Sequence, residues 1–304
     1  MRVRKLKSNN KSILFNRGNK KFIAELLSDR KNNVIITRRD LNNIEKVMDK
    51  ELITFYQSKT TKHRTKKQPK DYSPKKYRKF TDASPRRKRV LKKLNSYLNE
   101  LPIPHYLYSR SERGFFKNAK AHYGNVAFVL MDISSFFPNC TFEYVKNFFV
   151  RDSGLKMKPD LADKMAKLVT VPQSHNSHKR CVPQGFPTSP LICFFAYKFM
   201  FDKINNYAIK NNLTFSTYVD DITLSSKYDF DKEKVVNDIV SILNEYGHTS
   251  KTEKCKKINI TEPTCFPPTI TGIWVKRYKI RASKKIYDKM MKSYNYLISN
   301  KILD

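Results

Sequence analysis

The chain has 304 residues, with 61 lysines and arginines against 27 aspartates and glutamates, which gives a formal net charge of +34 at pH 7. An excess of this size favours a polyanionic partner, because binding to a polyanion releases its counterions. The sequence contains no apolar run long enough to span a membrane and no signal-peptide pattern. We therefore expect a soluble, cytoplasmic protein that has no membrane partner.

The five cysteines are odd in number and widely spaced, and none belongs to a CxxC pair. This usage favours reduced thiols over a disulfide framework. The series His175, His178 and Cys181 fits no common zinc-binding spacing, so a zinc site there is disfavoured.

Basic residues concentrate in the first part of the chain, where residues 1–90 carry 28 basic and 8 acidic side chains, a net charge of +20. Residues 1–60 are predicted to form a basic N-terminal extension, whose first part orders only on a partner. Apolar residues at helical spacing predict a helix at the end of this extension. They are Leu41, Ile44, Met48, Leu52 and Phe55. Residues 57–83 are polar and interrupted by prolines, which indicates an extended or loop segment.

Ser84 and Pro85 are predicted to cap and start the next helix. Its apolar face consists of Val90, Leu94, Tyr97, Leu98 and Leu101. Its other face carries the consecutive cations Arg86, Arg87, Lys88 and Arg89. Given the total charge, an anion-binding face is favoured over one that is only solvated.

The segment from Val126 to Ile133 is a nearly continuous apolar run, which predicts a buried strand ending on Asp132. A carboxylate at the end of a buried strand needs a hydrogen bond, a cation or a metal. Phe142, Val145 and Phe149 then predict a helix face. Residues 182–190 form a Pro/Gly-rich loop, in which Ser189 and Pro190 start a helix. This helix is predicted to run from Leu191 to about Tyr207, and it is apolar on nearly every side and therefore buried.

Residues 214–226 predict a hairpin, because β-branched and aromatic residues flank Asp220 and Asp221 on both sides. Both acids are predicted at the tip of its two-residue turn. Two adjacent carboxylates repel each other unless a cation lies between them. An amphipathic helix ending at Gly247 follows, then a strand around residues 270–275 and a last basic helix from about Ser283. This order predicts an α+β fold with an antiparallel sheet backed by helices.

Three carboxylates, those of Asp132, Asp220 and Asp221, thus stand at the ends of predicted strands. Three acids suffice to hold two divalent cations about 4 Å apart, an arrangement that activates a 3′-hydroxyl and neutralises a leaving pyrophosphate. The residues alone leave an acidic hairpin tip as the alternative.

The order of Asp132, Gln184-Gly185 and Tyr218-Val-Asp-Asp221 resembles the palm motifs of reverse transcriptases. Three further features resemble the retron type more narrowly: Asn118-Ala-x-x-His122, the extended Gln-Gly segment 182–190, and Ile270-Thr-Gly272. The resemblance implies a right-hand polymerase fold. Its parts would be fingers at residues 61–117, a palm at 118–275 with finger insertions at about 150–181, and a short thumb segment at 276–304.

The resemblance also implies roles for individual residues. Asp132, Asp220 and Asp221 would be catalytic metal ligands, together with the Ile133 carbonyl, holding two Mg²⁺ ions or Mn²⁺ in their place. The leaving pyrophosphate would be protonated by Lys254. The incoming dNTP would be bound by Arg78, Lys79, Phe137, Gln184 and Gly185, with the Phe137 ring excluding a 2′-hydroxyl. The template and primer would be contacted by Asn118, His122, Arg86, Arg87, Lys88 and Arg89.

Several of these residues have simpler alternatives, and the chain departs from the family pattern in two places. Phe137 would otherwise be a core residue, His122 a satisfied structural histidine and Lys254 a solvated lysine. Val219 replaces the alanine common in the retron hairpin. Only 32 residues follow Gly272, so either the thumb is minimal or the basic N-terminal region recognises the RNA.

The function that the resemblance implies is that of a retron RNA-directed DNA polymerase. It would copy a cognate structured noncoding RNA from an internal 2′-hydroxyl, giving branched RNA-linked single-stranded DNA (msDNA) in anti-phage defence with a separate effector protein. The alternatives are another defence-associated or group II intron-like reverse transcriptase with different priming, and a non-catalytic palm-fold scaffold that binds RNA.

Overall fold

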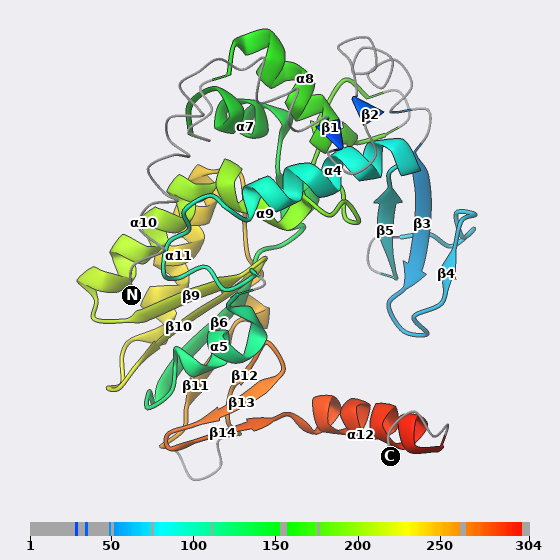
Figure 1. Ribbon diagram of the computed structural model, residues 1–304. Coiled ribbons are helices and arrows are strands. Elements are labelled where there is room, and N and C mark those ends of the chain that lie inside the picture. The colour runs from blue at the N-terminus through cyan, green and yellow to red at the C-terminus, as the bar shows by residue number, and fades with distance from the viewer. Residues whose placement is uncertain are drawn as a thin grey trace, which may run out of the picture. The chain divides into compact units, whose positions relative to one another are not determined.

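The structure is a computed structural model (Figure 1) that describes residues 28–29, 34–35, 49, 52–73, 76–110, 112–152, 157–174, 177–261 and 266–299. Most of the predicted N-terminal extension, and His175, lie outside the described residues. The described chain forms two compact units. The first contains the residues up to Leu101 and Phe137–Lys198, and the second contains Pro102–Phe136 and the residues from Phe199 onward. The predicted palm, residues 118–275, therefore contributes to both units.

The second unit is built on a four-stranded antiparallel sheet in the order β11-β6-β10-β9. The strands are β11 (Lys256–Asn259), β6 (Ala127–Asp132), β10 (Asp221–Ser226) and β9 (Thr214–Tyr218). In both central strands, β6 and β10, successive residues are buried on both faces. This burial explains why the apolar run before Asp132 does not alternate with polar residues.

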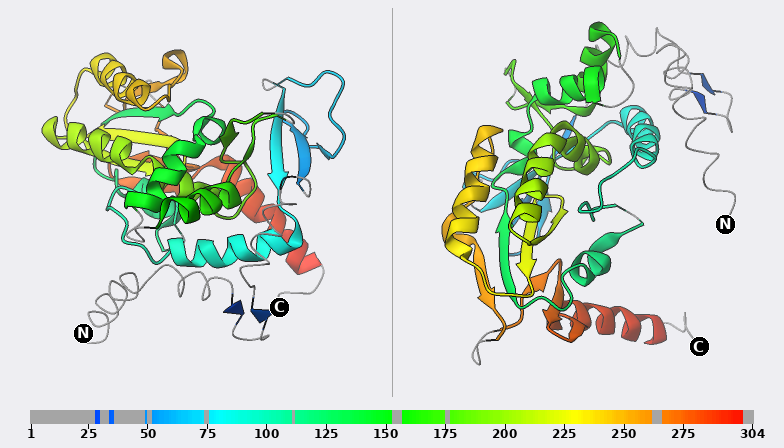
Figure 2. Two further views of the ribbon diagram at one scale, coloured as in Figure 1. Left: turned by 90° about the horizontal axis from the view of Figure 1, so that it is seen from above. Right: turned by 90° about the vertical axis from the view of Figure 1, so that its left-hand side faces the viewer.

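Helices cover both faces of this sheet (Figure 2, right). On one face lie α10 (Lys198–Lys210) and α11 (Lys232–Glu245), and on the other lies α5 (Gly114–Lys120). The α11 helix starts where the Asp231 carboxylate accepts a hydrogen bond from the Lys234 amide at 3.0 Å. It ends before Gly247, whose φ of +75° is the left-handed stop that was predicted.

A second, three-stranded sheet completes this unit in the order β12-β13-β14. Its strands are β12 (Thr269–Ile270), β13 (Ile273–Lys276) and β14 (Lys279–Ala282), and α12 (Lys284–Ser299) follows them. One core cluster joins the two sheets through α5 and consists of Ala119, Phe128, Ile270, Ile273 and Val275. The segments around the Asn-Ala-x-x-His and Ile-Thr-Gly features therefore pack against each other.

The first unit contains the sheet β4-β3-β5, formed by β4 (Arg64–Thr65), β3 (Ile53–Ser58) and β5 (Tyr77–Asp82). The helix predicted to reach Phe55 is wrong at that end, because Phe55 lies in β3. Its first residues, Leu41, Ile44 and Met48, lie outside the described part. The β-branched and aromatic residues of β3 pair with β5 along the whole strand. This pairing outweighs the helical spacing of the apolar residues. A second pair of strands, β1 (Ser28–Asp29) and β2 (Val34–Ile35), also belongs to this part of the chain.

The helices of the first unit include α4 (Pro85–Leu98), α7 (Phe142–Asn147), the π-helix η1 (Phe148–Asp152), α8 (Pro159–Val169) and α9 (Ser189–Ala196). The short elements are α6 (Phe136–Asn139), β7 (Val171–Pro172) and β8 (Arg180–Cys181). Ser84 caps α4 as predicted, with its hydroxyl accepting from the Arg87 amide. The single long helix predicted from Leu191 is instead two helices, α9 and α10, which break at Tyr197. Helices with antiparallel sheets in both units confirm the predicted α+β class.

Candidate active site

Asp132 and Asp221 are directly opposite each other in the central β6–β10 pair, at the end where β6 stops. Asp221 also pairs with Tyr218 on β9, so β10 is fixed on both edges at this position. Asp220 joins the same end, because its carbonyl accepts a hydrogen bond from the Ile133 amide at 3.0 Å. The backbone thus brings three acids that are distant in sequence to one edge of the sheet.

The turn of the hairpin consists of Val219 and Asp220, and Asp221 is already the first residue of β10. The prediction that both acids occupy the turn is therefore wrong by one residue. Val219 has a φ of +60°, a left-handed conformation that is uncommon for a β-branched side chain. Because the turn falls one residue earlier, Asp220 sits on the turn while Asp221 belongs to the regular strand.

The three carboxylates interact electrostatically. The pKa of Asp221 is raised to about 6, first because the surrounding protein displaces water from a side chain that still reaches solvent, and then because Asp220 and Asp132 are negatively charged. A raised pKa in a carboxylate means that its charged form lacks compensation. A cation placed among these acids would supply it.

The donor set fits a divalent cation of the Mg²⁺ type, which prefers carboxylate and carbonyl oxygens. In the described part of the chain, however, no group of three or more His, Cys, Asp or Glu side chains is arranged so that it could hold a metal ion. The chemistry of the site therefore fits the predicted ligands Asp132, Asp220, Asp221 and the Ile133 carbonyl, while their side chains are not prearranged as a cage.

The segment 249–255 runs beside the end of β6. The Ser134 amide donates to the Thr249 carbonyl at 2.8 Å, and Ile133 forms a β-bridge with Ser250. Lys254 lies on this segment, in the 3-10 turn η2 (Thr252–Lys254), and its side chain is exposed. The predicted lysine is thus on a segment adjoining the acids, with its amino group in solvent.

His122 and Asn118 are buried, unlike residues that contact RNA at a surface. The two ring nitrogens of His122 lie 2.6 Å from the Ser225 hydroxyl and 2.7 Å from the Ser216 hydroxyl. Burial lowers the pKa of His122 to about 3, so the ring is neutral and joins β9 to β10. For His122 the structural alternative describes the observed position. Asn118 donates to the Thr271 hydroxyl at 3.5 Å, which links the two retron-like features.

In the first unit, Gln184 and Gly185 lie against β5, the strand that carries Arg78 and Lys79. The Thr81 amide donates to the Gln184 carbonyl at 2.8 Å. Gly185 has a φ of +127°, and a Cβ there would stand 2.5 Å from the Thr81 carbonyl oxygen. Glycine is required by both the conformation and the close approach. Arg78 and Lys79 are exposed, so four of the predicted nucleotide-binding residues occupy adjoining elements.

The four consecutive cations of α4 do not share one role. Arg86 and Arg89 are exposed, and Lys88 forms an ion pair with Asp82 at 2.7 Å. Arg87 is 1% exposed and its guanidinium bonds main-chain carbonyls inside the unit. The structure therefore removes Arg87 from the predicted RNA-contacting face and leaves Arg86 and Arg89 on it.

Phe136 and Phe137 are also distinguished by their surroundings. The Phe136 ring is buried, with ring centroids of Phe201 and His248 at 6.0 Å and 5.2 Å. Phe137 is only partly buried. Of the two rings, Phe137 is therefore the more exposed to solvent.

Sequence reasoning missed the partners of these residues. Ser216 and Ser225 stand in strands that the sequence predicts to be buried in part, and buried hydroxyls require partners. This signal could have pointed to a polar network around His122. The hydrogen bond between Thr81 and Gln184 joins two backbone groups, so no pattern of side chains in the sequence could predict it.

Comparison with known proteins identifies a family and a relative that are similar to this chain. Residues 29–298 match the family model described as reverse transcriptase (RNA-dependent DNA polymerase). The retron Se72 reverse transcriptase of Salmonella heidelberg (strain 579083-10) is 28% identical over 194 residues, which cover 62% of this chain and 48% of that protein. The matched region thus spans about half the length of this curated relative.

Two solved structures are also similar to the chain. One is telomerase from Candida albicans in complex with a TWJ fragment of telomeric RNA, with a TM-score of 0.48 and 12% identity over 68% of this chain and 45% of that one. The other is apo telomerase from Candida tropicalis truncated from its C-terminal domain, with a TM-score of 0.44 and 17% identity over 65% and 45%.

Among the described helices, none combines the length and the apolar character needed to cross a membrane. The family match covers both units and most of the chain, and it confirms the predicted polymerase-type α+β fold. The chain therefore belongs to the reverse transcriptase (RNA-dependent DNA polymerase) family.

Proposed function

We propose that this chain is the RNA-directed DNA polymerase of a retron. It copies a cognate structured noncoding RNA, uses dNTPs, and produces branched RNA-linked single-stranded DNA in anti-phage defence with a separate effector protein. The observation that carries the polymerase function is the register that sets Asp132 opposite Asp221 beside Asp220, in a chain of the reverse transcriptase family. The retron assignment is supported by the similarity to the retron Se72 reverse transcriptase.

In this proposal the three acids hold divalent cations, Mg²⁺ or Mn²⁺, which when bound supply charge neutralisation for the triphosphate and activate the primer hydroxyl. The raised pKa of Asp221 supports a place for positive charge here. Gln184 and Gly185 orient the incoming nucleotide and the template. Arg78 and Lys79, on the neighbouring strand, bind the triphosphate, and Lys254 donates a proton to the leaving pyrophosphate.

The polymerase function is tested with the full chain, a primed RNA template and labelled dNTPs. Asp221→Asn and Asp220→Asn should each reduce DNA synthesis about a thousandfold or more, because each removes charge from the cation site. RNA binding should be nearly unchanged. The matched control is Asp229→Asn, which changes an exposed acid that is paired with Lys232. Near-wild-type synthesis by Asp221→Asn would contradict the proposed role of these acids.

Removal of the metal provides an independent check. A chelator should abolish DNA synthesis, and added Mg²⁺ or Mn²⁺ should restore it. RNA binding should persist without the divalent cation. If the wild-type chain binds RNA but incorporates no dNTP at any divalent-ion concentration, the non-catalytic scaffold is the correct function.

Sugar discrimination tests Phe137. Phe137→Ala should admit ribonucleotides, because removal of a partly exposed ring makes room for a 2′-hydroxyl. The measurement is the ratio of kcat/KM for dNTP and rNTP in the variant and the wild type. An unchanged ratio would place the selection elsewhere.

The retron assignment is tested by isolating the protein from its native host and sequencing the nucleic acid that co-purifies. Covalently joined RNA and DNA are expected, together with the effector protein. RNA without joined DNA would contradict the retron assignment and leave the polymerase function intact.

A further inference from the structure

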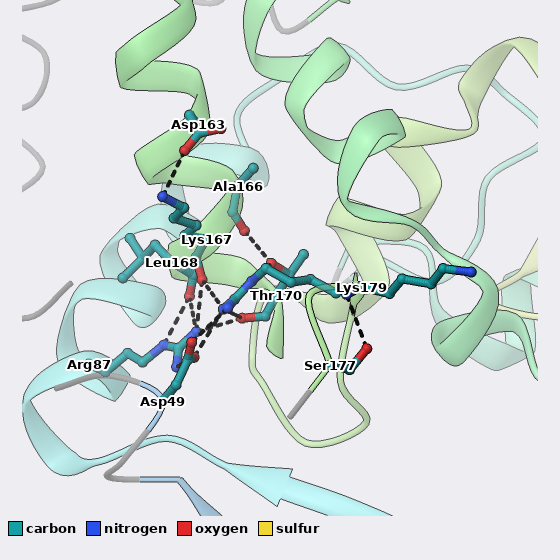
Figure 3. A network of polar contacts seen from close by, with 10 residues as sticks. Asp49, Arg87, Asp163, Ala166, Lys167, Leu168, Thr170, Ser177 and Lys179 are labelled. Atoms are coloured by element: carbon teal, nitrogen blue, oxygen red, sulfur yellow. Dashed lines mark hydrogen bonds and ion pairs between the residues drawn. The ribbon is translucent and has the colours of Figure 1, made fainter. Parts of the chain in front are cut away.

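Arg87 is the largest charged side chain that is fully buried in the described part of the chain, and its donors are directed at the C-terminal end of α8 (Figure 3). Its Nε lies 3.0 Å from the Leu168 carbonyl oxygen. One terminal nitrogen donates to the carbonyls of Lys167, Leu168 and Thr170 at 3.0, 2.9 and 2.8 Å. The guanidinium thus bonds carbonyls that the end of a helix leaves without intrahelical partners.

The charge of this arginine is retained. Burial lowers the pKa of Arg87 to about 10, an effect that the nearby Asp49 carboxylate opposes at 3.8 Å. The group is therefore still a cation at neutral pH. Burying a cation costs free energy unless the cation is well bonded. The burial of Arg87 is therefore hard to explain by bonding to the end of α8 alone.

The same guanidinium also lies over an aromatic ring in the loop that follows Gly185. Its central carbon is 4.7 Å from the centroid of the Phe186 ring. Phe186 is 3% exposed and follows Gln184 and Gly185 directly in the chain. A desolvated guanidinium stacked on an aromatic ring is among the stronger contacts of this type. Arg87 thereby holds the loop after Gly185 in place.

The same short stretch of chain holds the loop before Gly185. Thr81, at the end of β5, donates to the Gln184 carbonyl, and Ser84 connects β5 to α4 by capping the amide of Arg87. The two ends of residues 81–87 therefore contact the two neighbours of Gly185: Thr81 bonds Gln184, and Arg87 packs on Phe186. Gly185 lies between them with its α-carbon against the Thr81 carbonyl.

We propose that Arg87 is a positioning residue, which acts through Phe186 to hold Gln184 and Gly185 in register with β5. The consequence for nucleotide binding rests on the proposed polymerase function, since β5 also carries the cations Arg78 and Lys79. The positioning itself is a property of the first unit and does not depend on that function.

Arg180 serves as the control, because it bonds two of the same carbonyls and also pairs with Asp49, while its side chain is 13% exposed against 1% for Arg87. It donates to the Thr170 and Lys167 carbonyls at 2.9 and 3.3 Å and forms a two-fold ion pair with Asp49 at 2.6 and 3.0 Å. Among the described residues, Arg87 is the cation that lies over the Phe186 ring. Arg180→Lys therefore weakens the bonding at the end of α8, together with the pair to Asp49, and leaves the contact between Arg87 and Phe186 in place.

The first experiment measures hydrogen exchange of the backbone amides in the full chain, without nucleotide or template. Arg87→Lys keeps a charge but loses the planar stack and the fork of donors, so exchange should rise in residues 182–188 and at the end of α8. Phe186→Leu keeps Arg87 and its carbonyl bonds, so exchange should rise in residues 182–188 alone. Arg180→Lys should raise exchange at the end of α8 alone.

The second experiment measures steady-state DNA synthesis by the same variants. Arg87→Lys and Phe186→Leu should each raise the KM for dNTP about fivefold or more, with a smaller change in kcat. The double variant should be no worse than the more affected single variant, because both changes remove one contact. Arg180→Lys should leave the KM for dNTP unchanged.

The two experiments separate the two proposals. Unchanged exchange in residues 182–188 of both Arg87→Lys and Phe186→Leu overturns the positioning role, whatever the activity. If Arg87→Lys fails to fold, Phe186→Leu decides the same question. If the wild type makes no DNA but the exchange pattern is as expected, the positioning role stands and the proposed polymerase function fails.

Discussion

Replacement of His122 tests the buried network that joins β9 and β10, the two strands of the hairpin that carries Asp220 and Asp221. In His122→Ala, the hydroxyls of Ser216 and Ser225 each lose a hydrogen bond that is 2.7 or 2.6 Å long in the wild type. A buried hydroxyl left without its partner costs about 1–3 kcal/mol. The Ser225 hydroxyl still accepts a hydrogen bond from the Asn125 amide at 2.6 Å, so the penalty falls on Ser216, and the free energy of unfolding should fall by about 1–3 kcal/mol at pH 7.5.

The same residue predicts a dependence on pH. The pKa of His122 is lowered from 6.5 to about 3, because the ring is buried. Above pH 6.5 the ring is neutral in both the folded and the unfolded state, and its contribution to stability is complete. As the pH falls below 6.5, the unfolded chain takes up a proton that the folded chain refuses, so stability is lost. Between pH 7.5 and 5.0 this linkage amounts to about 2 kcal/mol.

The assay is urea unfolding of wild type, His122→Ala and a control, His63→Asn, at pH 7.5 and pH 5.0. His63 is exposed. The loss of stability between the two pH values should be about 2 kcal/mol smaller in His122→Ala than in the control. His248, whose pKa burial lowers to about 4, is present in all three proteins and cancels in this difference. Equal pH dependence in His122→Ala and His63→Asn would refute the reasoning.

Three further predictions concern the backbone. Gly185→Ala should destabilise the protein far more than Gly124→Ala. Both glycines have a positive φ, but only a Cβ at position 185 would clash with a main-chain oxygen, at 2.5 Å. Melting curves of the two variants measure the difference. Ser84→Ala should lose about 1 kcal/mol with the N-cap bond, whereas Ser96→Ala on the exposed face of the same helix should be nearly neutral in urea unfolding. Val219→Gly should raise the unfolding free energy by about 1 kcal/mol by relieving a φ of +60°, and a lower value would show that the valine is unstrained.

Local signals predicted the elements whose causes are local. The Ser84–Pro85 start of α4 and the Gly247 end of α11 depend on single residues, and both are found where they were expected. The apolar run before Asp132 predicted β6, because a strand buried on both faces needs no polar alternation. In each case the residue that decides the structure lies within the element itself.

Elements decided by distant partners were not predictable in the same way. Phe55 continues a helical spacing but lies in a strand, because β5 supplies its pairing partner from elsewhere in the chain. The break at Tyr197 is invisible in a segment that is apolar on all sides. Gly and Pro signals are absent there, and only packing fixes the boundary between α9 and α10.

The site shows the same division. The acids were identified from their types and order, yet the turn is one residue earlier than expected because Val219 takes the left-handed position. Among the four consecutive cations, nothing in the sequence distinguishes Arg87 from Arg86 or Arg89. Its burial depends on the carbonyls of a helix that begins more than 70 residues later, and these become neighbours only in the folded chain.

The pairing of Asp132 with Asp221 has a consequence for biosynthesis. One acid ends the first strand of the large sheet, and the other begins a strand that the ribosome makes only after the whole of the first unit's second segment. Closing so long a loop is slow and entropically costly before native contacts compensate for it. A nascent chain therefore cannot bring the three acids together until β10 has left the exit tunnel.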